Sequence, residues 1–158
     1  MSSTLRAWGR WSGRACGPEG RPADRRAAAD SAADSAIDSV VGRWHTTVSS
    51  PGKPPTRVVI VFRTDHRVEI TGQTSIAGAP ACVGGGSWWT TSADGLGFEV
   101  THPLPSPGGG VLGTVRSHQE GALSADRFST SGEAFVDQPD GSTAGPYPVS
   151  TVGTPARR

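Results

Sequence analysis

Turn-forming residues recur at short intervals from residue 37 onward, and this spacing restricts the fold more than any other feature. Residues 50–55 contain three prolines, which cannot donate to a β-ladder. Asp94-Gly95 is a pair that favours the positive φ of a hairpin turn, and residues 138–141 form another cluster of this kind. After residue 40 no long segment shows helical periodicity, which argues against parallel βαβ units.

The segments between these turns are rich in β-branched and aromatic residues, so we expect each to be a strand. Eight strands with mostly short connections form an antiparallel up-and-down meander, and closing it into a barrel removes the exposed edges. The interior of an eight-stranded barrel has room for packed side chains or for one small ligand. The predicted strands are residues 40–49, 57–64, 67–74, 83–91, 96–102, 111–121, 127–137 and 147–154.

Residues 1–36 differ in composition from the rest of the chain, since Ala, Arg, Gly, Asp, Ser and Pro dominate them. Such a segment buries too little apolar surface to offset the entropy cost of ordering it. We predict a disordered N-terminal tail over 1–36 and an all-β barrel domain over 37–158. The alternative is that Trp8 and Trp11, with the arginines beside them, bind a partner or a membrane surface.

Overall charge does not suggest a nucleic-acid partner. Lys and Arg number 15 and Asp and Glu 14, which gives a net charge of +1, and Lys53 is the only lysine. No apolar run is long enough for a transmembrane helix, so we expect a cytoplasmic protein with no membrane partner. The two cysteines, Cys16 and Cys82, are far apart, and the histidines lack metal-ligand spacing, so we expect no metal and no cofactor.

Four short motifs occur in a familiar order. A Gly-x-Trp lies in Val40–Trp44, and it is followed by Val61–Asp65 before a turn, by Gly84–Trp88 and by Phe128–Gly132. Over about 37–158 the chain resembles the small bacterial lipocalin-like (calycin-type) β-barrel proteins, although it has Asp65-His66 where Asp-Gly is expected. The resemblance implies a barrel around a small hydrophobic molecule. It also implies a link to natural-product biosynthesis, where some such barrels fold a polyene or polyketide for cyclisation.

Strand alternation separates inward from outward residues, with Trp44 and Phe62 taken as inward. Gly84, Gly86, Gly132 and Ala134 then remove interior volume, which favours a cavity. The alternative is that these glycines ease strand curvature and twist. Trp88 is either a stacking surface for a ligand or part of a packed core. The side chains predicted to contact a ligand are Trp44, Thr46, Ile60, Phe62, Trp88, Phe98, Ser117 and Thr130.

Two residues are the candidates for catalysis. His102 ends a predicted strand and is either a general acid or base at the barrel mouth or a surface histidine, and Gln119 points inward and could polarise a substrate. Arg116, His118 and Glu120 share the opposite face of the strand 111–121, so they point outward unless a bulge reverses the phase. Reversal would make them an acid–base cluster inside the barrel.

Three functions are compatible with these patterns. The first is a barrel that binds a small molecule and acts as a cyclase or isomerase on an apolar polyene or polyketide, by positioning it in a desolvated cavity. The second is a binding or carrier barrel without chemistry, and the third is a structural domain with a filled core. On the outside, Trp89 with Val59 and Val61 is expected to form an apolar patch that a homodimer would cover.

Overall fold

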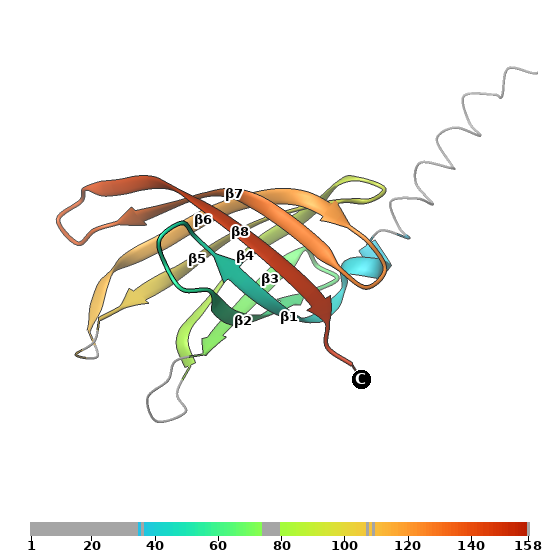
Figure 1. Ribbon diagram of the computed structural model, residues 1–158, viewed down its shortest axis with the longest axis horizontal. Helices are drawn as coiled ribbons and strands as arrows, with labels where there is room; N and C mark the ends of the chain where they lie inside the picture. The colour runs from blue at the N-terminus through green and yellow to red at the C-terminus, as the bar shows by residue number, and fades with distance from the viewer. Residues whose placement is uncertain (1–34, 36, 74–79, 107, 109, 158) are drawn as a thin grey trace, which may run out of the picture.

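The computed structural model describes residue 35 and residues 37–73, 80–106, 108 and 110–157, so the predicted tail lies almost entirely outside the described residues. These residues form a closed antiparallel β-barrel of eight strands, which confirms the predicted fold class (Figure 1). The strands are β1 (Gly42–Ser49), β2 (Thr56–Phe62), β3 (Arg67–Gln73), β4 (Pro80–Ser92), β5 (Gly95–Pro105), β6 (Val111–Leu123), β7 (Phe128–Asp137) and β8 (Thr143–Pro155).

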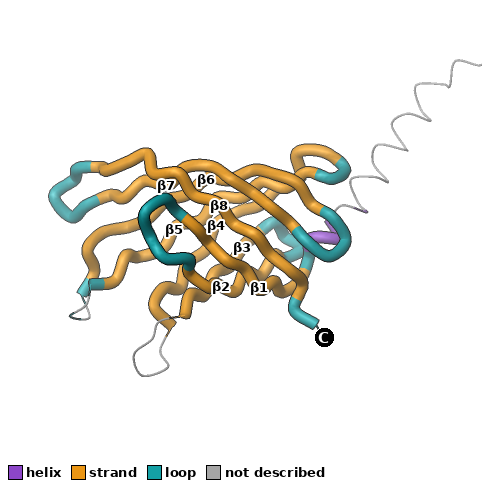
Figure 2. Tube along the Cα trace, in the orientation of Figure 1, coloured by secondary structure: helices purple, strands orange, loops and turns teal. Residues whose placement is uncertain are grey.

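Each strand pairs with its sequence neighbours, and β1 pairs with β8 to close the barrel. The up-and-down order therefore places connections alternately at the two ends. The connections β2–β3, β4–β5 and β6–β7 share one end with the single helical turn at residues 37–40, as Figure 2 shows. The connections β1–β2 and β7–β8, together with the described part of β5–β6, lie at the other end.

Four strands, β4, β5, β6 and β8, are longer than predicted, and in β5 and β8 the added residues include prolines that run beyond one neighbouring strand. The strand β5 extends through Pro103 and Pro105, and these residues pair only with β6, since the pairing with β4 stops at Thr101. Likewise, β8 contains Pro148, which pairs with β7 beyond the end of β1. A proline lacks the N–H that a second neighbour would need, so it is tolerated where a strand has only one neighbour.

An aromatic cluster fills the end of the barrel beside the helical turn. The ring of Phe62 makes edge-to-face contacts with Trp88, Phe98 and Phe128 at centroid distances of 5.9, 5.8 and 5.8 Å. Trp44 packs against Phe128 at 5.2 Å. All five side chains are buried, and the geometry is the one that aromatic quadrupoles favour. This end of the barrel is therefore solid core and not cavity.

The two tryptophans of the cluster are fixed by backbone contacts at its rim. The indole N–H of Trp44 donates to the carbonyl of Val40 in the helical turn at 2.8 Å. Between the turn and β1, Gly42 takes a φ of +138°, a conformation that glycine adopts readily. The indole N–H of Trp88 donates to the carbonyl of Arg63 at 2.8 Å. The Gly-x-Trp motif thus seals the end of the barrel.

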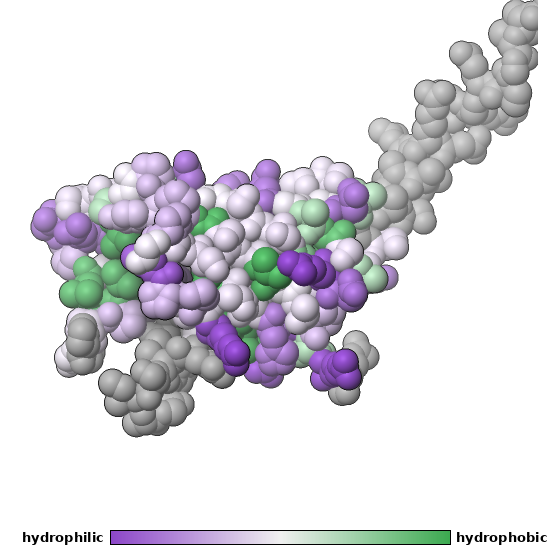
Figure 3. All heavy atoms as spheres, in the orientation of Figure 1, coloured by the Kyte–Doolittle hydropathy of each residue, from purple (hydrophilic) through white to green (hydrophobic). Residues whose placement is uncertain are grey.

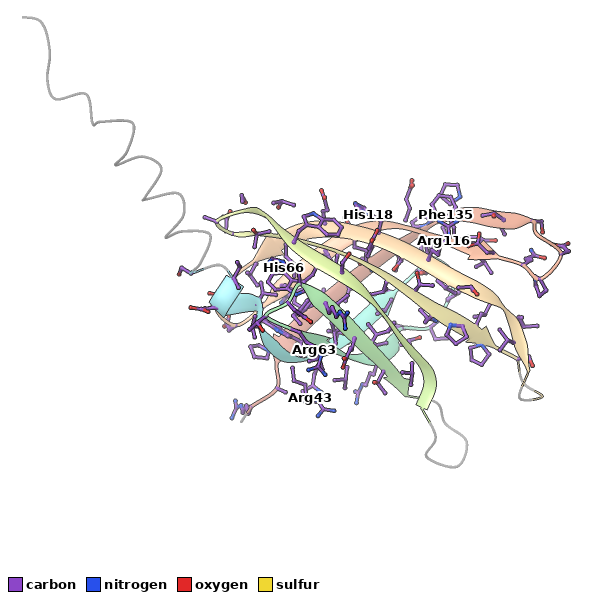
Figure 4. The ribbon with its side chains drawn as sticks, turned by 180° about the vertical axis from the view of Figure 1, so that it is seen from behind. Arg43, Arg63, His66, Arg116, His118 and Phe135 are labelled. Carbon is purple, nitrogen blue, oxygen red and sulfur yellow. The ribbon has the colours of Figure 1, made fainter. Side chains whose placement is uncertain are left out.

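His66 occupies the turn position where the resemblance suggests glycine. Its φ is +63°, which explains that expectation, because side chains other than glycine seldom adopt this conformation. The His66 imidazole contacts the Trp88 ring, with 4.8 Å between the ring centroids, and its Nδ1 lies 3.1 Å from the Trp88 carbonyl oxygen. That carbonyl can only accept, so Nδ1 carries a proton and donates. Figure 4 shows His66 at the sealed end.

The three glycines expected to empty the interior do not do so. A Cβ added to Gly84, Gly86 or Gly132 would fall on the carbonyl oxygen of the adjacent strand, that of Glu99 in the case of Gly86. The interpretation of these glycines as cavity volume is therefore wrong. They permit the close strand approach that strong curvature requires, which is the alternative given above.

Replacing Gly86 by alanine should destabilise the barrel by about 1–3 kcal/mol, because the methyl group would overlap the Glu99 carbonyl. The measurement is the free energy of unfolding in urea. Gly108→Ala is the matched control, since a Cβ there meets nothing within 4 Å, and its effect should stay within about 0.5 kcal/mol. Equal effects of the two substitutions would contradict the role given to Gly86.

The strand β6 presents Arg116, His118 and Glu120 to solvent, which confirms the predicted phase of 111–121 and excludes the acid–base cluster inside the barrel. Arg116 forms a two-pronged ion pair with Asp137 at 2.5 and 3.0 Å and lies 5.8 Å from the Phe135 ring, as seen on the outer face in Figure 4. This guanidinium, with the Thr143 hydroxyl, lowers the pKa of the Asp137 carboxyl from 3.8 to about 2.

The lowered pKa gives a prediction for acid stability. A carboxyl with a lower pKa in the folded state stabilises the fold above its unfolded pKa, and that contribution is lost as pH falls through the folded pKa. Wild type should therefore exceed Asp137→Asn in unfolding free energy at neutral pH, and the difference should shrink between pH 3.8 and about 2. A difference that does not change over this interval would contradict the assignment.

Candidate functional site

A cavity of about 340 Å³ occupies the half of the barrel that the aromatic cluster leaves unfilled. Phe98 belongs to both, so the cluster forms the floor of the cavity. The described wall residues are apolar and come from seven of the strands, β1 to β3 and β5 to β8. These wall residues are Val48, Val58, Ile60, Ile70, Phe98, Val100, Leu104, Val115, Ala134, Val136 and Val149.

A small polar group lies at the bottom of this apolar space. Gln119 on β6 and Thr151 on β8 both line the cavity, and their exposed fractions are only 3% and 1%. Thr130 on β7 lies between them in the register and donates its hydroxyl to Gln119 Oε1 at 3.1 Å. The amide nitrogen of Gln119 is thus left as the donor of that side chain.

The Thr151 hydroxyl has no hydrogen-bond partner within the described part of the protein. A buried polar group without a partner typically costs about 1–3 kcal/mol, so a ligand atom that hydrogen-bonded to this hydroxyl would offset that cost. Its neighbour Thr46 shows the contrast, because its hydroxyl donates to the Val58 carbonyl at 2.7 Å. Thr151 and the Gln119 amide together could bind an oxygen atom of a molecule in the cavity.

Two threonine substitutions should change the free energy of unfolding in opposite directions. Thr151→Val removes the unpartnered hydroxyl and should raise the free energy of unfolding by about 1 kcal/mol. Thr130→Val removes the donor to Gln119 Oε1 and should lower it by about 1–3 kcal/mol. Denaturant unfolding of both variants measures this, and a loss of stability in Thr151→Val would show that its hydroxyl is already satisfied.

The mouth of the cavity carries its titratable side chains. Lys53 in the β1–β2 connection, His102 on β5 and Tyr147 on β8 all line it. The Lys53 Nζ lies 5.6 Å from the centroid of the Tyr147 ring, a cation–π contact. His102 Nδ1 lies 2.9 Å from the carbonyl oxygen of Pro103, and because that oxygen can only accept, Nδ1 is the donor in this contact.

Five of the predicted site residues meet in this cavity. They are the two predicted catalytic residues, His102 at the mouth and Gln119 at the floor, and the predicted ligand contacts Ile60, Phe98 and Ser117. The other predicted contacts lie in the packed core around the floor, namely Trp44, Thr46, Phe62, Trp88 and Thr130. The binding and catalytic roles of all ten residues stay predictions.

Sequence reasoning missed Thr151, Lys53 and Tyr147. Thr151 follows the inward phase of β8, to which the sequence interpretation assigned no interior residues. Lys53 stands out in the sequence as the only lysine, but only the closed barrel places its loop at the cavity mouth. Tyr147 reaches the mouth because β8 extends beyond β1.

The predicted outer patch of Trp89, Val59 and Val61 is not one surface. Trp89 leans over Gly97 of β5 towards β6, where it stacks on His118 at 5.2 Å and its indole N–H donates to Glu120 at 3.3 Å. Exposed large apolar side chains occur instead near the open end, and green side chains gather there in Figure 3. The exposed large apolar side chains among the described residues are Val83, Val111, Leu112 and Tyr147.

The described residues contain no group of three or more His, Cys, Asp and Glu side chains arranged to hold a metal ion. They also contain no helix of the length and hydropathy needed to cross a membrane.

Comparisons with solved structures match the fold. A redesigned β-barrel is similar at a TM-score of 0.53 and 18% identity, over 77% of this chain and 96% of that one. EF1p2_mFAP2b bound to DFHBI is similar at a TM-score of 0.59 and 19% sequence identity, and the match covers 78% of this chain and 99% of that one. Rv2717c from M. tuberculosis has a TM-score of 0.41 and 14% sequence identity, and the match covers 79% of this chain and 98% of that one. No protein-family model and no curated protein matches the sequence.

Proposed function

We propose that the barrel binds one small, mostly apolar molecule inside the cavity. The observation that carries the proposal is a space of about 340 Å³ with apolar walls and an unpartnered hydroxyl at its floor. Ligand sites of this size are lined mainly by apolar side chains, and a few polar groups orient the ligand. A filled structural core, the third function considered above, would not leave this volume.

The floor indicates which part of the ligand enters first. Gln119 presents an amide N–H and Thr151 a hydroxyl, and both can donate to a carbonyl or hydroxyl oxygen. An oxygen at the inner end of the ligand would give the Thr151 hydroxyl a hydrogen-bond partner. A barrel of similar fold, EF1p2_mFAP2b, is bound to DFHBI, which supports small-molecule binding in this architecture.

Titration with prodan, a fluorescent apolar ketone, tests the proposal. Its emission should shift to the blue on binding, and Thr151→Val or Gln119→Leu should each weaken binding by about three- to tenfold because a hydrogen bond to the ketone is lost. Thr154→Val is the control, since Thr154 is exposed on the outer face of the same strand. The proposal fails if prodan does not bind, or if all three variants bind it like wild type.

A second proposal is that the bound molecule cyclises or isomerises in the cavity. Gln119 at the floor and His102 at the mouth support it, because they place a hydrogen-bond donor and a titratable group at the two ends of one apolar space. A flexible polyene or polyketide held there would need only a change of bonding within one molecule, with no atom gained or lost. Positioning alone lowers the barrier to such a step.

The second proposal is tested with a linear polyene that cyclises slowly without a catalyst. A catalytic barrel should accelerate ring formation and give one stereoisomer in excess, and Gln119→Leu should reduce both effects. Chiral chromatography of the products measures this. Unchanged rate and unselective product, with the polyene shown to be bound, would leave a binding or carrier barrel.

A further inference from the structure

The cavity mouth has a one-sided charge. Its described lining contains the ammonium of Lys53 and no carboxylate. Lys53 is also the only lysine in a sequence whose other cationic side chains, histidines aside, are all arginine. A ligand whose apolar part fills the barrel must place its outer end beside this ammonium.

Lys53 differs from several of the arginines on the barrel. Arg63 pairs with Glu69 at 2.7 Å and Arg116 pairs with Asp137, so their charges are compensated on the outer face. Within the described part of the chain no such ion pair forms at Lys53, and its ammonium lies over the Tyr147 ring. Among the residues that the structure describes, no carboxylate compensates the positive charge at the mouth.

The backbone around Lys53 is restrained. Pro51, Pro54 and Pro55 fix three φ angles in the β1–β2 connection, and the Lys53 N–H donates to the Ser50 carbonyl at 3.2 Å. A restrained loop loses less conformational entropy when its side chain engages a ligand. The contact with Tyr147 also links this loop to β8, on the other side of β1.

We propose that the ligand is an amphipathic carboxylic acid, with its apolar body in the barrel and its carboxylate at the mouth beside Lys53. This inference rests on the proposed binding function and specifies its ligand class. A single ammonium balances a single carboxylate, whereas an amine of the same shape would be repelled. With an oxygen at the floor as well, the complementary molecule is a hydroxy or oxo acid.

Calorimetric titration with three probes of equal chain length tests the inference, each below its critical micelle concentration. Wild type should bind decanoate about two- to fivefold more tightly than decanol, the range of an exposed ion pair, and decylamine should bind more weakly than both. Decyl phosphate is a fourth probe, and tighter binding of it than of decanoate would overturn the choice of a carboxylate.

Variants then assign the preference to one side chain. Lys53→Met keeps an apolar stem and removes the charge, so the advantage of decanoate over decanol should disappear while decanol binding stays unchanged. Lys53→Arg should retain the advantage. Arg57→Met is the matched control, because it removes one positive charge nearby in the sequence but on the outer face of β2.

The possible outcomes distinguish a failure of the carboxylic-acid inference from a failure of the proposed small-molecule binding. If none of the probes binds, the proposed binding function fails for ligands of this size. If decanol binds as tightly as decanoate, or if Lys53→Met retains the preference, the cavity binds ligands but the acid inference is wrong. Loss of the preference in Arg57→Met as well would indicate a general charge effect and would also overturn it.

Discussion

Aromatic packing at one end of the barrel is the interaction on which the rest of the structure depends. Phe62 contacts three other rings, and the Trp44 and Trp88 indoles are hydrogen-bonded to backbone carbonyls at the rim. Because these large side chains are concentrated at one end, the other end contains mainly Val, Ile, Ala, Ser and Thr. The cavity therefore results from an uneven distribution of side-chain volume along the barrel axis.

This uneven distribution of side-chain volume also places close packing and the polar cavity floor on different residues. The solid end contains closely packed large side chains, and Val40 of the helical turn and Phe128 are completely buried there. Next to it, the Thr151 hydroxyl lines the cavity and has no hydrogen-bond partner among the described residues. The polar floor lies at the boundary between these two halves.

Most of the fold could be predicted from the sequence because turns and alternation are local signals. The eight strands, the inward phase of Trp44, Phe62 and Gln119 and the outward phase of Arg116 all follow from them. The glycines could not be interpreted this way. A missing side chain in a strand leaves the same pattern whether it opens space or admits a neighbouring backbone, and only the three-dimensional distance from Gly86 to Glu99 distinguishes the two.

The site was less accessible for a related reason. Periodicity shows that a side chain points inward but not how far along the barrel axis it lies, so Trp88 and Ile60 look equivalent in sequence. In the structure one is in the solid end and the other lines the cavity. The cation at the mouth comes from a loop, to which strand alternation does not apply.

The overhanging parts of β5 and β8 have a consequence for how such a barrel can change. Beyond Thr101 and before Ser150 these strands are bonded on one side only, so the hairpins β5–β6 and β7–β8 project past the closed ring of hydrogen bonds. Insertions, deletions or prolines in these projections alter the rim without breaking the ring. The barrel can therefore acquire a new ligand preference at its entrance while the folding unit beneath it stays the same.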